Sequence, residues 1–322
     1  MKEKILELLN NTNDYISGQA LAKQLGVSRQ AIWKGINALK DNGCVIDSVT
    51  NKGYRLVSLP EYLNEAAVKG FLKTNIIGKN LIVLDSVTST NDYLKKLGNE
   101  GCANGTVVAT REQNKGKGRL GRVWQSRRDD NVMFSLLLRP NISPSEVAAI
   151  TPIAGLAVCK ALREFTGLDL KIKWPNDIIF ENKKLVGILT EMSAEFDAVE
   201  YIVTGIGINV DQTNFPEEIA HKATSLLLET GRHYDKNKLL ACVLAHLEEE
   251  FIRHNLELSP AAVEEYTSLC ATIGKSVTFK RNACDISGTA VGIAPSGELK
   301  VKLPDDSTCT VNSGEVTVQG IY

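Results

Sequence analysis

The stretch 171-KIKWPNDIIFENKKLVGILTEMSAEFDAVEYIVTGIGIN-209 decides the fold of the largest part of this 322-residue chain. Short apolar runs rich in β-branched residues predict strands at 171–173, 178–180, 185–192 and 199–206. The strands from residue 178 to residue 206 follow one another with only short turns. This pattern predicts an antiparallel or mixed sheet rather than a doubly wound parallel one.

Further strands and helices are predicted on both sides of that stretch. Strand patterns occur at 81–85, 106–110 and 132–138, and helical patterns at 92–97, 145–165 and 236–255. We therefore expect residues 65–270 to form one central domain, within a multidomain chain of the α+β class.

The first 60 residues predict a winged helix-turn-helix domain. Ser17 and Ser28 are placed to cap a second and a third helix, and Asn42-Gly43 to end the third. Alternating residues around the turn Asn51-Lys52-Gly53 predict a two-stranded wing. In such domains the third helix enters the major groove of DNA. The candidate DNA contacts are Arg29, Gln30, Trp33 and Lys34 on that helix, with Lys52 and Arg55 on the wing.

Residues 271–322 lack a helical period. Apolar and polar residues alternate in short runs between turns such as Pro295-Ser296-Gly297. We expect a small β-barrel here, of the SH3-like kind. A linker is expected to begin at Leu59-Pro60, between the first domain and the central one.

Composition gives few constraints but one local signal. The net charge is −1 and no apolar run approaches the ~18 residues of a membrane span, so we expect a cytoplasmic protein without a membrane partner. None of the seven cysteines forms a Cys-x-x-Cys pair, which favours reduced thiols.

Residues 111–128 hold seven basic residues against one acidic residue. That excess predicts a phosphate site, although a solvated basic loop would show the same excess.

The sequence Gly116-Lys117-Gly118-Arg119-Leu120-Gly121 lies inside this basic segment. It has the form G-x-G-x-x-G, but a dinucleotide site needs a helix directly after the motif, and none is predicted here. The alternative is a mobile loop whose glycines let the backbone approach a ligand while its basic side chains meet phosphates.

Two other motifs lie on the predicted sheet. Lys173-Trp174-Pro175-Asn176-Asp177 falls between two strands, where on its own it would be only a turn. Gly187 and Gly205-Ile206-Gly207-Ile208-Asn209 place glycine within strands, which indicates close packing against the backbone. Together the glycines could form the floor of a site for a flat ligand, although bulges in the sheet would give the same pattern.

Taken in order, these motifs resemble those of the biotin–protein ligases. The resemblance rests on Ser89-Thr90-Asn91, Gln113 with the basic loop, Lys173–Asp177, the strand that begins at Lys184, and the segment from Gly205 to Asn209. With the first and last domains it covers nearly the whole chain, and it is greatest to the bacterial ligase–repressors. It implies a central fold like that of class II aminoacyl-tRNA synthetases.

The resemblance also implies an activity. ATP, with Mg²⁺, and biotin would form biotinyl-5′-adenylate, which would then acylate a lysine of a biotin carboxyl carrier domain, in acetyl-CoA carboxylase or another biotin-dependent enzyme. By motif position, Lys184, Arg119 and Asp177 would be catalytic. The expected biotin-binding residues are Ser89, Thr90, Asn91, Gln113, Gly116, Lys117, Arg119, Lys184, Gly187 and Gly205. The expected adenylate-binding residues are Arg119, Arg122, Trp124, Lys184 and Asn209, with Mg²⁺ near Asn209.

The basic loop departs from the family pattern in one respect. Lys117 and Leu120 occupy places where some relatives carry arginine, while Arg119 and Arg122 remain. Lysine is a point charge rather than a planar fork, so the grip on the intermediate is expected to be looser.

Regulation would follow if the adenylate ordered loops that also form a homodimer surface. The dimer would then present two winged helices to operator DNA, with biotinyl-5′-adenylate as corepressor. Two alternatives remain at this point. One is a lipoate–protein ligase with the same two-step chemistry, and the other is a regulator that senses a small ligand without catalysis.

Overall fold

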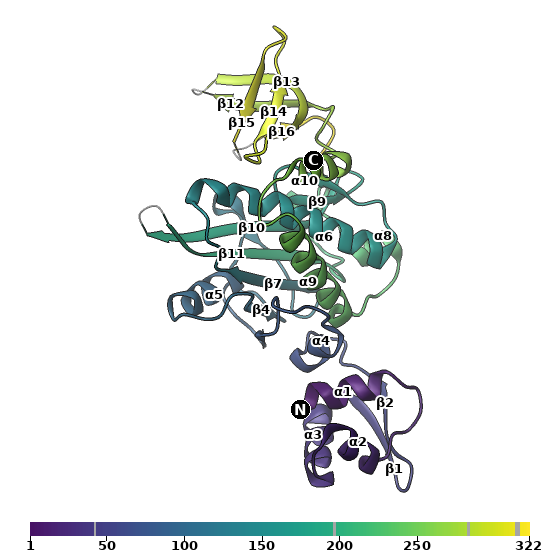
Figure 1. Cartoon of the computed structure of the whole chain (residues 1–322). Helices are drawn as coiled ribbons and strands as arrows, with labels where there is room; N and C mark the ends of the chain where they lie inside the picture. The colour runs from purple at the N-terminus through teal and green to yellow at the C-terminus, as the bar shows by residue number, and fades with distance from the viewer. Residues whose placement is uncertain (42, 196–197, 282–283, 313–315) are drawn as a thin grey trace.

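The computed structural model describes residues 1–41, 43–195, 198–281, 284–312 and 316–322. The chain forms three bodies in a row, with helix α4 (Glu65–Phe71) between the first and the second (Figure 1). Asn42, which belongs to the predicted end of the third helix, lies outside the described residues.

The first body is the predicted helix-turn-helix with its wing. Its elements are α1 (Lys2–Asn10), α2 (Gly18–Leu25), α3 (Arg29–Asp41), β1 (Val45–Val49) and β2 (Gly53–Ser58). The side chain of Ser17 accepts a hydrogen bond from the amide of Ala20 at 3.0 Å, and that of Ser28 from Ala31 at 3.1 Å. Both predicted caps are therefore confirmed, and they set the ends of the two helices that surround the turn.

The segment that joins the first two bodies is fixed rather than loose. The buried amide of Asn237 donates hydrogen bonds to the carbonyls of Pro60, at 3.2 Å, and Tyr62, at 3.1 Å. Its oxygen accepts from the amide of Asn64 at 2.8 Å. Helix α4, which follows, adds apolar side chains to the cores of both bodies.

The second body contains a seven-stranded mixed sheet, as predicted. The strand order is β3-β4-β7-β11-β10-β9-β8, with β3 and β4 parallel and every other neighbouring pair antiparallel. The strands are β3 (Leu81–Leu84), β4 (Val107–Thr110), β7 (Asn131–Leu138), β8 (Lys171–Lys173), β9 (Asp177–Phe180), β10 (Lys183–Glu195) and β11 (Ala198–Asn209).

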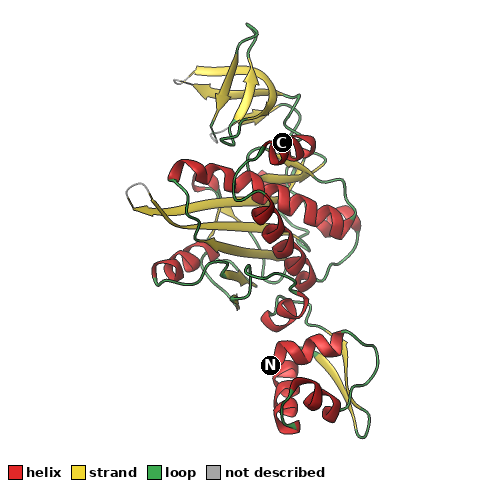
Figure 2. Ribbon diagram, in the orientation of Figure 1, coloured by secondary structure: helices red, strands yellow, loops and turns green. Residues whose placement is uncertain are grey.

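Helices cover both faces of this sheet (Figure 2). Successive strand residues point to opposite faces. Val107 and Leu136 belong to the large core with α6 (Ile150–Thr166), α9 (Lys236–Arg253) and α10 (Pro260–Leu269), while Val108 and Leu137 pack with α5 (Thr90–Asn99). The remaining helices are the 3₁₀ helices η1 (Arg119–Gly121) and η2 (Pro144–Ala149) and the short α7 (Glu217–Ala220) and α8 (Leu226–Thr230).

The segment Pro144–Thr166 is long and apolar enough to cross a membrane, although no such span was expected from the sequence. However, 72% of its apolar window is buried inside the protein. Its composition therefore matches that of a core helix packed between the sheet and α9.

The third body is a five-stranded antiparallel sheet with the order β15-β14-β13-β12-β16. Its strands are β12 (Ser276–Arg281), β13 (Cys284–Ile293), β14 (Leu299–Lys302), β15 (Thr308–Val311) and β16 (Val316–Val318). The predicted small all-β domain is confirmed at this level.

Candidate active site

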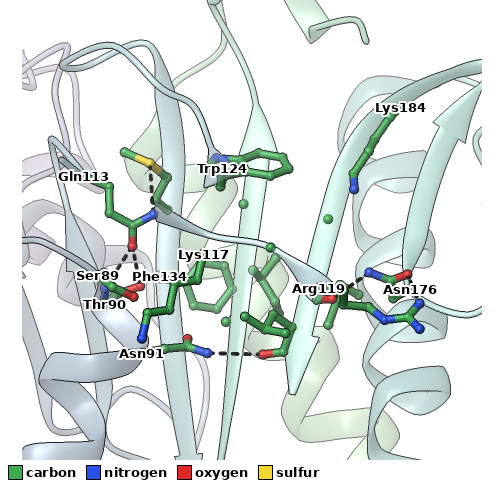
Figure 3. A pocket seen from close by; sticks show the side chains of 18 residues that line it. Ser89, Thr90, Asn91, Gln113, Lys117, Arg119, Trp124, Phe134, Asn176 and Lys184 are labelled. Carbon is green, nitrogen blue, oxygen red and sulfur yellow. Dashed lines mark hydrogen bonds between the residues drawn. The ribbon is translucent and has the colours of Figure 1, made fainter. Parts of the chain in front are cut away.

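A pocket opens on the face of the central sheet that carries α5 (Figure 3). Figure 3 places Ser89, Thr90 and Gln113 on one side of it, Lys184, Arg119 and Asn176 on the other, and Trp124 between them. Its lining consists of Ser89, Thr90, Asn91, Gln113, Lys117, Gly118, Arg119, Trp124, Met133, Phe134, Asn176, Lys184, Gly187, Ile188, Leu189, Gly205, Ile206 and Gly207. Most of the predicted biotin-binding residues thus lie together.

Neutral polar groups form one end of the pocket. The side-chain oxygen of Gln113 accepts hydrogen bonds from the amide of Thr90 at 2.8 Å and from its hydroxyl at 3.1 Å. The Ser135 hydroxyl lies 2.6 Å from Asn91 Oδ1, and Asn91 Nδ2 donates to Glu191 at 2.7 Å. Fixed donors and acceptors of this kind suit a neutral amide-like ligand group.

Glycines form the floor, and an indole lies on it. Gly187 and Gly207 are direct partners across β10 and β11. A Cβ atom would approach the Trp124 ring to 2.8 Å at Gly187 and to 2.5 Å at Gly207. At Gly205 a Cβ would lie 2.2 Å from Asn91 Oδ1. In this structure the strand glycines therefore make room for Trp124 and Asn91.

Lys184 provides positive charge at the other end. Its Nζ lies 2.6 Å from Asp177 Oδ1, and the two side chains are 29% and 14% exposed. The Lys184 amide donates to the carbonyl of Lys222 at 2.8 Å, while its carbonyl accepts from Thr224 at 2.9 Å. The Lys184 backbone, in β10, is therefore hydrogen-bonded through both its amide and its carbonyl to the segment that leads to α8.

The basic loop is folded as a small hairpin over the pocket. Strand β5 (Gly116–Lys117) pairs with β6 (Val123–Trp124), and no long helix follows the glycine motif, as expected. Arg119 donates to Asn176 Oδ1 at 2.9 Å, and Lys117 Nζ lies 2.7 Å from Asp92. These two polar contacts and the Trp124 indole on the glycine floor therefore join the hairpin to the body of the domain.

Four predicted residues lie outside the pocket lining. Gly116 is buried beside it, since a Cβ there would lie 2.5 Å from the Trp124 carbonyl. Arg122 is exposed on the hairpin. Asp177 lies behind Lys184. Asn209 is buried and donates to the carbonyl of Thr224 at 2.9 Å, so its contact is with the segment next to Lys184.

The surroundings of Asn209 do not resemble a metal cage. Among the described residues, the group of histidine and carboxylate side chains close enough together to hold an ion is Glu250, His254 and Glu265. Lys160 already neutralises it, with Nζ 2.6 Å from Glu250 and 2.8 Å from Glu265. A magnesium ion at the pocket would therefore depend on nucleotide phosphates for most of its ligands.

Several lining residues had no predicted role. Asn176 and Gly207 belong to two of the motifs described above, so their place in the pocket could have been predicted from the neighbouring motif residues. Met133, Phe134 and Leu189 lie in strands that are buried on both faces. Because residues of both faces are then apolar, the sequence pattern does not distinguish the side chains that line the pocket from those of the core.

Lys173 lies close to this site, and its shifted pKa makes its contribution to stability depend on pH. Burial lowers the pKa of Lys173 to about 8, against an opposing effect of the Asp177 carboxylate. Between that value and the ordinary one near 10.5, the unfolded chain keeps a proton that the folded chain has lost. The contribution of this lysine to the free energy of unfolding must therefore rise with pH across that interval.

We expect the urea midpoint of wild-type protein to rise relative to that of Lys173→Met between about pH 7.5 and about pH 9.5. Lys171→Met, on the same strand, is the matched control and should keep the wild-type pH dependence. Parallel curves for wild type and Lys173→Met would contradict the assignment.

The residues predicted to contact DNA lie on α3 and on the wing. Arg29, Gln30, Trp33 and Lys34 are all exposed on α3, opposite the buried Ile32, Gly35, Ile36 and Leu39, and Trp33 is 56% exposed. On the wing Lys52 is exposed, whereas Arg55 stacks 4.8 Å from the Tyr15 ring centroid and lies 3.5 Å from Asp47.

Comparison with known proteins agrees with this arrangement. Residues 83–209 match the biotin/lipoate A/B protein ligase family, residues 2–55 an HTH domain, and residues 272–318 the biotin protein ligase C-terminal domain. The chain is 36% identical to the bifunctional ligase/repressor BirA of Bacillus subtilis over 93% of both chains. It is 30% identical to that of Escherichia coli, over 92% of this chain and 90% of the relative.

A solved structure gives the same result. The biotin protein ligase from Aquifex aeolicus, in complex with biotin and ATP, is 32% identical and has a TM-score of 0.64. The match covers 75% of this chain and 99% of the other. The chain therefore belongs to the family of bifunctional ligase/repressors, in which a helix-turn-helix domain is joined to a biotin protein ligase.

Proposed function

We propose that this pocket joins biotin to ATP and then delivers biotin to a protein lysine. In the first step a carboxylate oxygen of biotin attacks the α-phosphorus of ATP, the bond to pyrophosphate breaks, and biotinyl-5′-adenylate forms. In the second step the amine of a lysine on a biotin carboxyl carrier domain attacks the acyl carbon. AMP leaves, and the amine loses a proton.

One observation carries this proposal: the pocket combines a neutral hydrogen-bonding end with a cationic end. Thr90, Asn91 and Gln113 form the neutral end, with Ser89 beside them, and suit the ureido head of biotin. Lys184 and Arg119 form the cationic end, where the biotin carboxylate and the α-phosphate, both negative, must meet. Positioning and charge neutralisation supply most of the rate in such a reaction.

The other residues take supporting roles. Trp124 is expected to stack on adenine, with Gly116, Lys117 and Arg122 in the covering hairpin. Gly187 leaves room for Trp124 and Lys184, Gly205 leaves room for Asn91, and Asn209 supports the Lys184 segment through Thr224. Asp177 orients the incoming lysine or assists its deprotonation. Magnesium bound to ATP would neutralise part of the charge on its phosphates.

We propose that repression is coupled thermodynamically to adenylate binding. Adenylate that orders the hairpin and the segment before α8 would favour a homodimer, and the dimer would bind a palindromic operator of biotin synthesis or uptake genes. Operator binding that is equally tight with and without biotin and ATP would contradict this.

We also propose that the protein is cytoplasmic. Its three domains would span residues 1–60, 65–270 and 271–322, and the last would close as an SH3-like barrel.

Arg29→Ala is expected to weaken operator binding about tenfold or more, since a base contact is worth roughly 1–3 kcal/mol. Biotin-dependent pyrophosphate release should be unchanged, because α3 is remote from the pocket (Figure 1). Lys4→Ala, on α1, removes a similar charge from the same domain and is the control. The two measurements are fluorescence anisotropy with operator DNA and pyrophosphate release. Equal operator affinities for Arg29→Ala and Lys4→Ala would contradict the role of α3.

Pyrophosphate release from ATP with biotin or with lipoate separates the proposed function from its alternatives. We expect release with biotin, and little with lipoate, which has no ureido group to satisfy Gln113 and Thr90. Release with lipoate alone would indicate a lipoate ligase. A folded protein that binds biotin without releasing pyrophosphate would indicate a sensor.

A further inference from the structure

The last residue of the chain is held firmly against the central domain. After β16 the chain turns at Gly320, whose φ is +76°, and Ile321 forms a bridge back to Val318. Ile321 is 3% exposed and belongs to the large core. The C-terminus consequently lies beside α10 and β9 (Figure 1).

The Tyr322 side chain contacts Asp177 and Lys173, two residues of the central sheet next to the pocket. Its hydroxyl donates a hydrogen bond to Asp177 Oδ2 at 2.5 Å, and Lys173 Nζ lies 3.4 Å from the centroid of its ring. Burial raises the pKa of the Tyr322 phenol, and the Asp177 carboxylate adds to this effect. The phenol therefore remains protonated and acts as a donor throughout the neutral range.

The Asp177 carboxylate contacts both this phenol and Lys184, at the cationic end of the pocket. While Oδ2 accepts from Tyr322, Oδ1 lies 2.6 Å from Lys184 Nζ. The connection Tyr322–Asp177–Lys184 spans the third body and the central sheet, and it uses both oxygens of one carboxylate. A carboxylate held by a neutral donor on one side can present its other oxygen in a fixed direction.

We propose that Tyr322 is a positioning residue for the adenylation reaction, which it serves by fixing Asp177 and, through it, Lys184. This inference rests on the proposed function. Lysine has a long flexible side chain, so a fixed carboxylate lowers the cost of keeping its ammonium at the pocket. When the ammonium turns to the biotin carboxylate and α-phosphate, Asp177 keeps the Tyr322 hydrogen bond and is not left buried without a partner.

The test is a double-mutant cycle of Tyr322→Phe and Asp177→Asn, measured by biotin-dependent pyrophosphate release from the full chain. Tyr322→Phe should lower kcat about tenfold and leave KM for biotin within about twofold, because the neutral end of the pocket is unaffected. In the Asp177→Asn background the same change should alter kcat by less than about twofold.

Tyr201→Phe is the matched control, since it also removes a phenol hydroxyl with a side-chain acceptor, here Asn99 at 2.6 Å, but away from the pocket. Its kcat should equal that of wild type. Thermal unfolding of each variant monitors the fold. A simple structural loss would lower kcat by the same factor with or without Asp177, and that result would overturn the proposal.

Two failures are distinguishable. Wild-type protein without biotin-dependent release would refute the proposed function itself. Active wild type with a fully active Tyr322→Phe would refute only the positioning role of Tyr322.

Discussion

Lys184→Ala is expected to lower kcat for biotin-dependent pyrophosphate release at least about 10²-fold, the usual cost of losing a preorganised group that meets developing charge. Lys184 is the cation whose backbone amide and carbonyl are both hydrogen-bonded to the segment before α8 and whose ammonium is paired with Asp177 at the pocket. Its removal takes one of the two cations, Lys184 and Arg119, from the end of the pocket where the two anionic reactants must meet. Biotin binding without ATP should change much less, since the neutral end is intact.

Lys183→Ala is the matched control, because Lys183 precedes Lys184 on β10 but is exposed and outside the pocket lining. It should retain wild-type kcat. Lys184→Arg should be intermediate, since arginine keeps the charge but not the shape of the ammonium. Equal rates for Lys184→Ala and Lys183→Ala would remove Lys184 from the mechanism.

Gly205→Ala is expected to damage both stability and biotin binding. The new Cβ would lie 2.2 Å from Asn91 Oδ1, so the buried Asn91 must move. Its hydrogen bonds with Ser135 and Glu191, at 2.6 Å and 2.7 Å, would then be lost or distorted. Leaving such groups unsatisfied costs about 1–3 kcal/mol of unfolding free energy. We expect the biotin affinity to fall about tenfold as well, since Asn91 belongs to the neutral end.

Urea unfolding and calorimetric titration with biotin measure these two effects. Gly155→Ala is the control: on helix α6 the added Cβ would meet its nearest neighbour, Tyr266, at 3.9 Å, an ordinary contact. That variant should bind biotin normally and be as stable as wild type or more so by about 0.5–1 kcal/mol. A Gly205→Ala protein with wild-type stability and affinity would show that Asn91 is not held as described.

The parts of the fold that sequence predicted are those encoded by local chemistry. Ser17 and Ser28 cap helices through atoms three residues away, so the pattern around each serine was sufficient. The small number of residues that separate β9, β10 and β11 along the chain predicted their antiparallel order in the same way. Helices α4 and α10 were not predicted, although each begins with a local cap: the Asn64 side chain accepts from the Ala67 amide at 3.2 Å, and that of Ser259 accepts from the Ala262 amide at 3.2 Å.

The site was predictable as a set of motifs but not as a geometry. Trp124 and Gly207 lie in different motifs, and only the folded sheet brings a glycine floor under the indole. Asn209, expected by motif near the nucleotide, donates a hydrogen bond to the backbone carbonyl of Thr224, a contact that the motif did not predict. The contact between Tyr322 and Asp177 joins residues 145 positions apart and follows from the docking of the third body, for which no local pattern exists.

The most direct test of the account is the intact mass of a biotin carboxyl carrier domain after incubation with this protein, ATP and biotin. We predict one added biotinyl group on one lysine, dependent on ATP and absent with Lys184→Ala. A carrier domain that stays unmodified beside folded, biotin-binding wild-type protein would contradict the claim that this pocket activates biotin and transfers it.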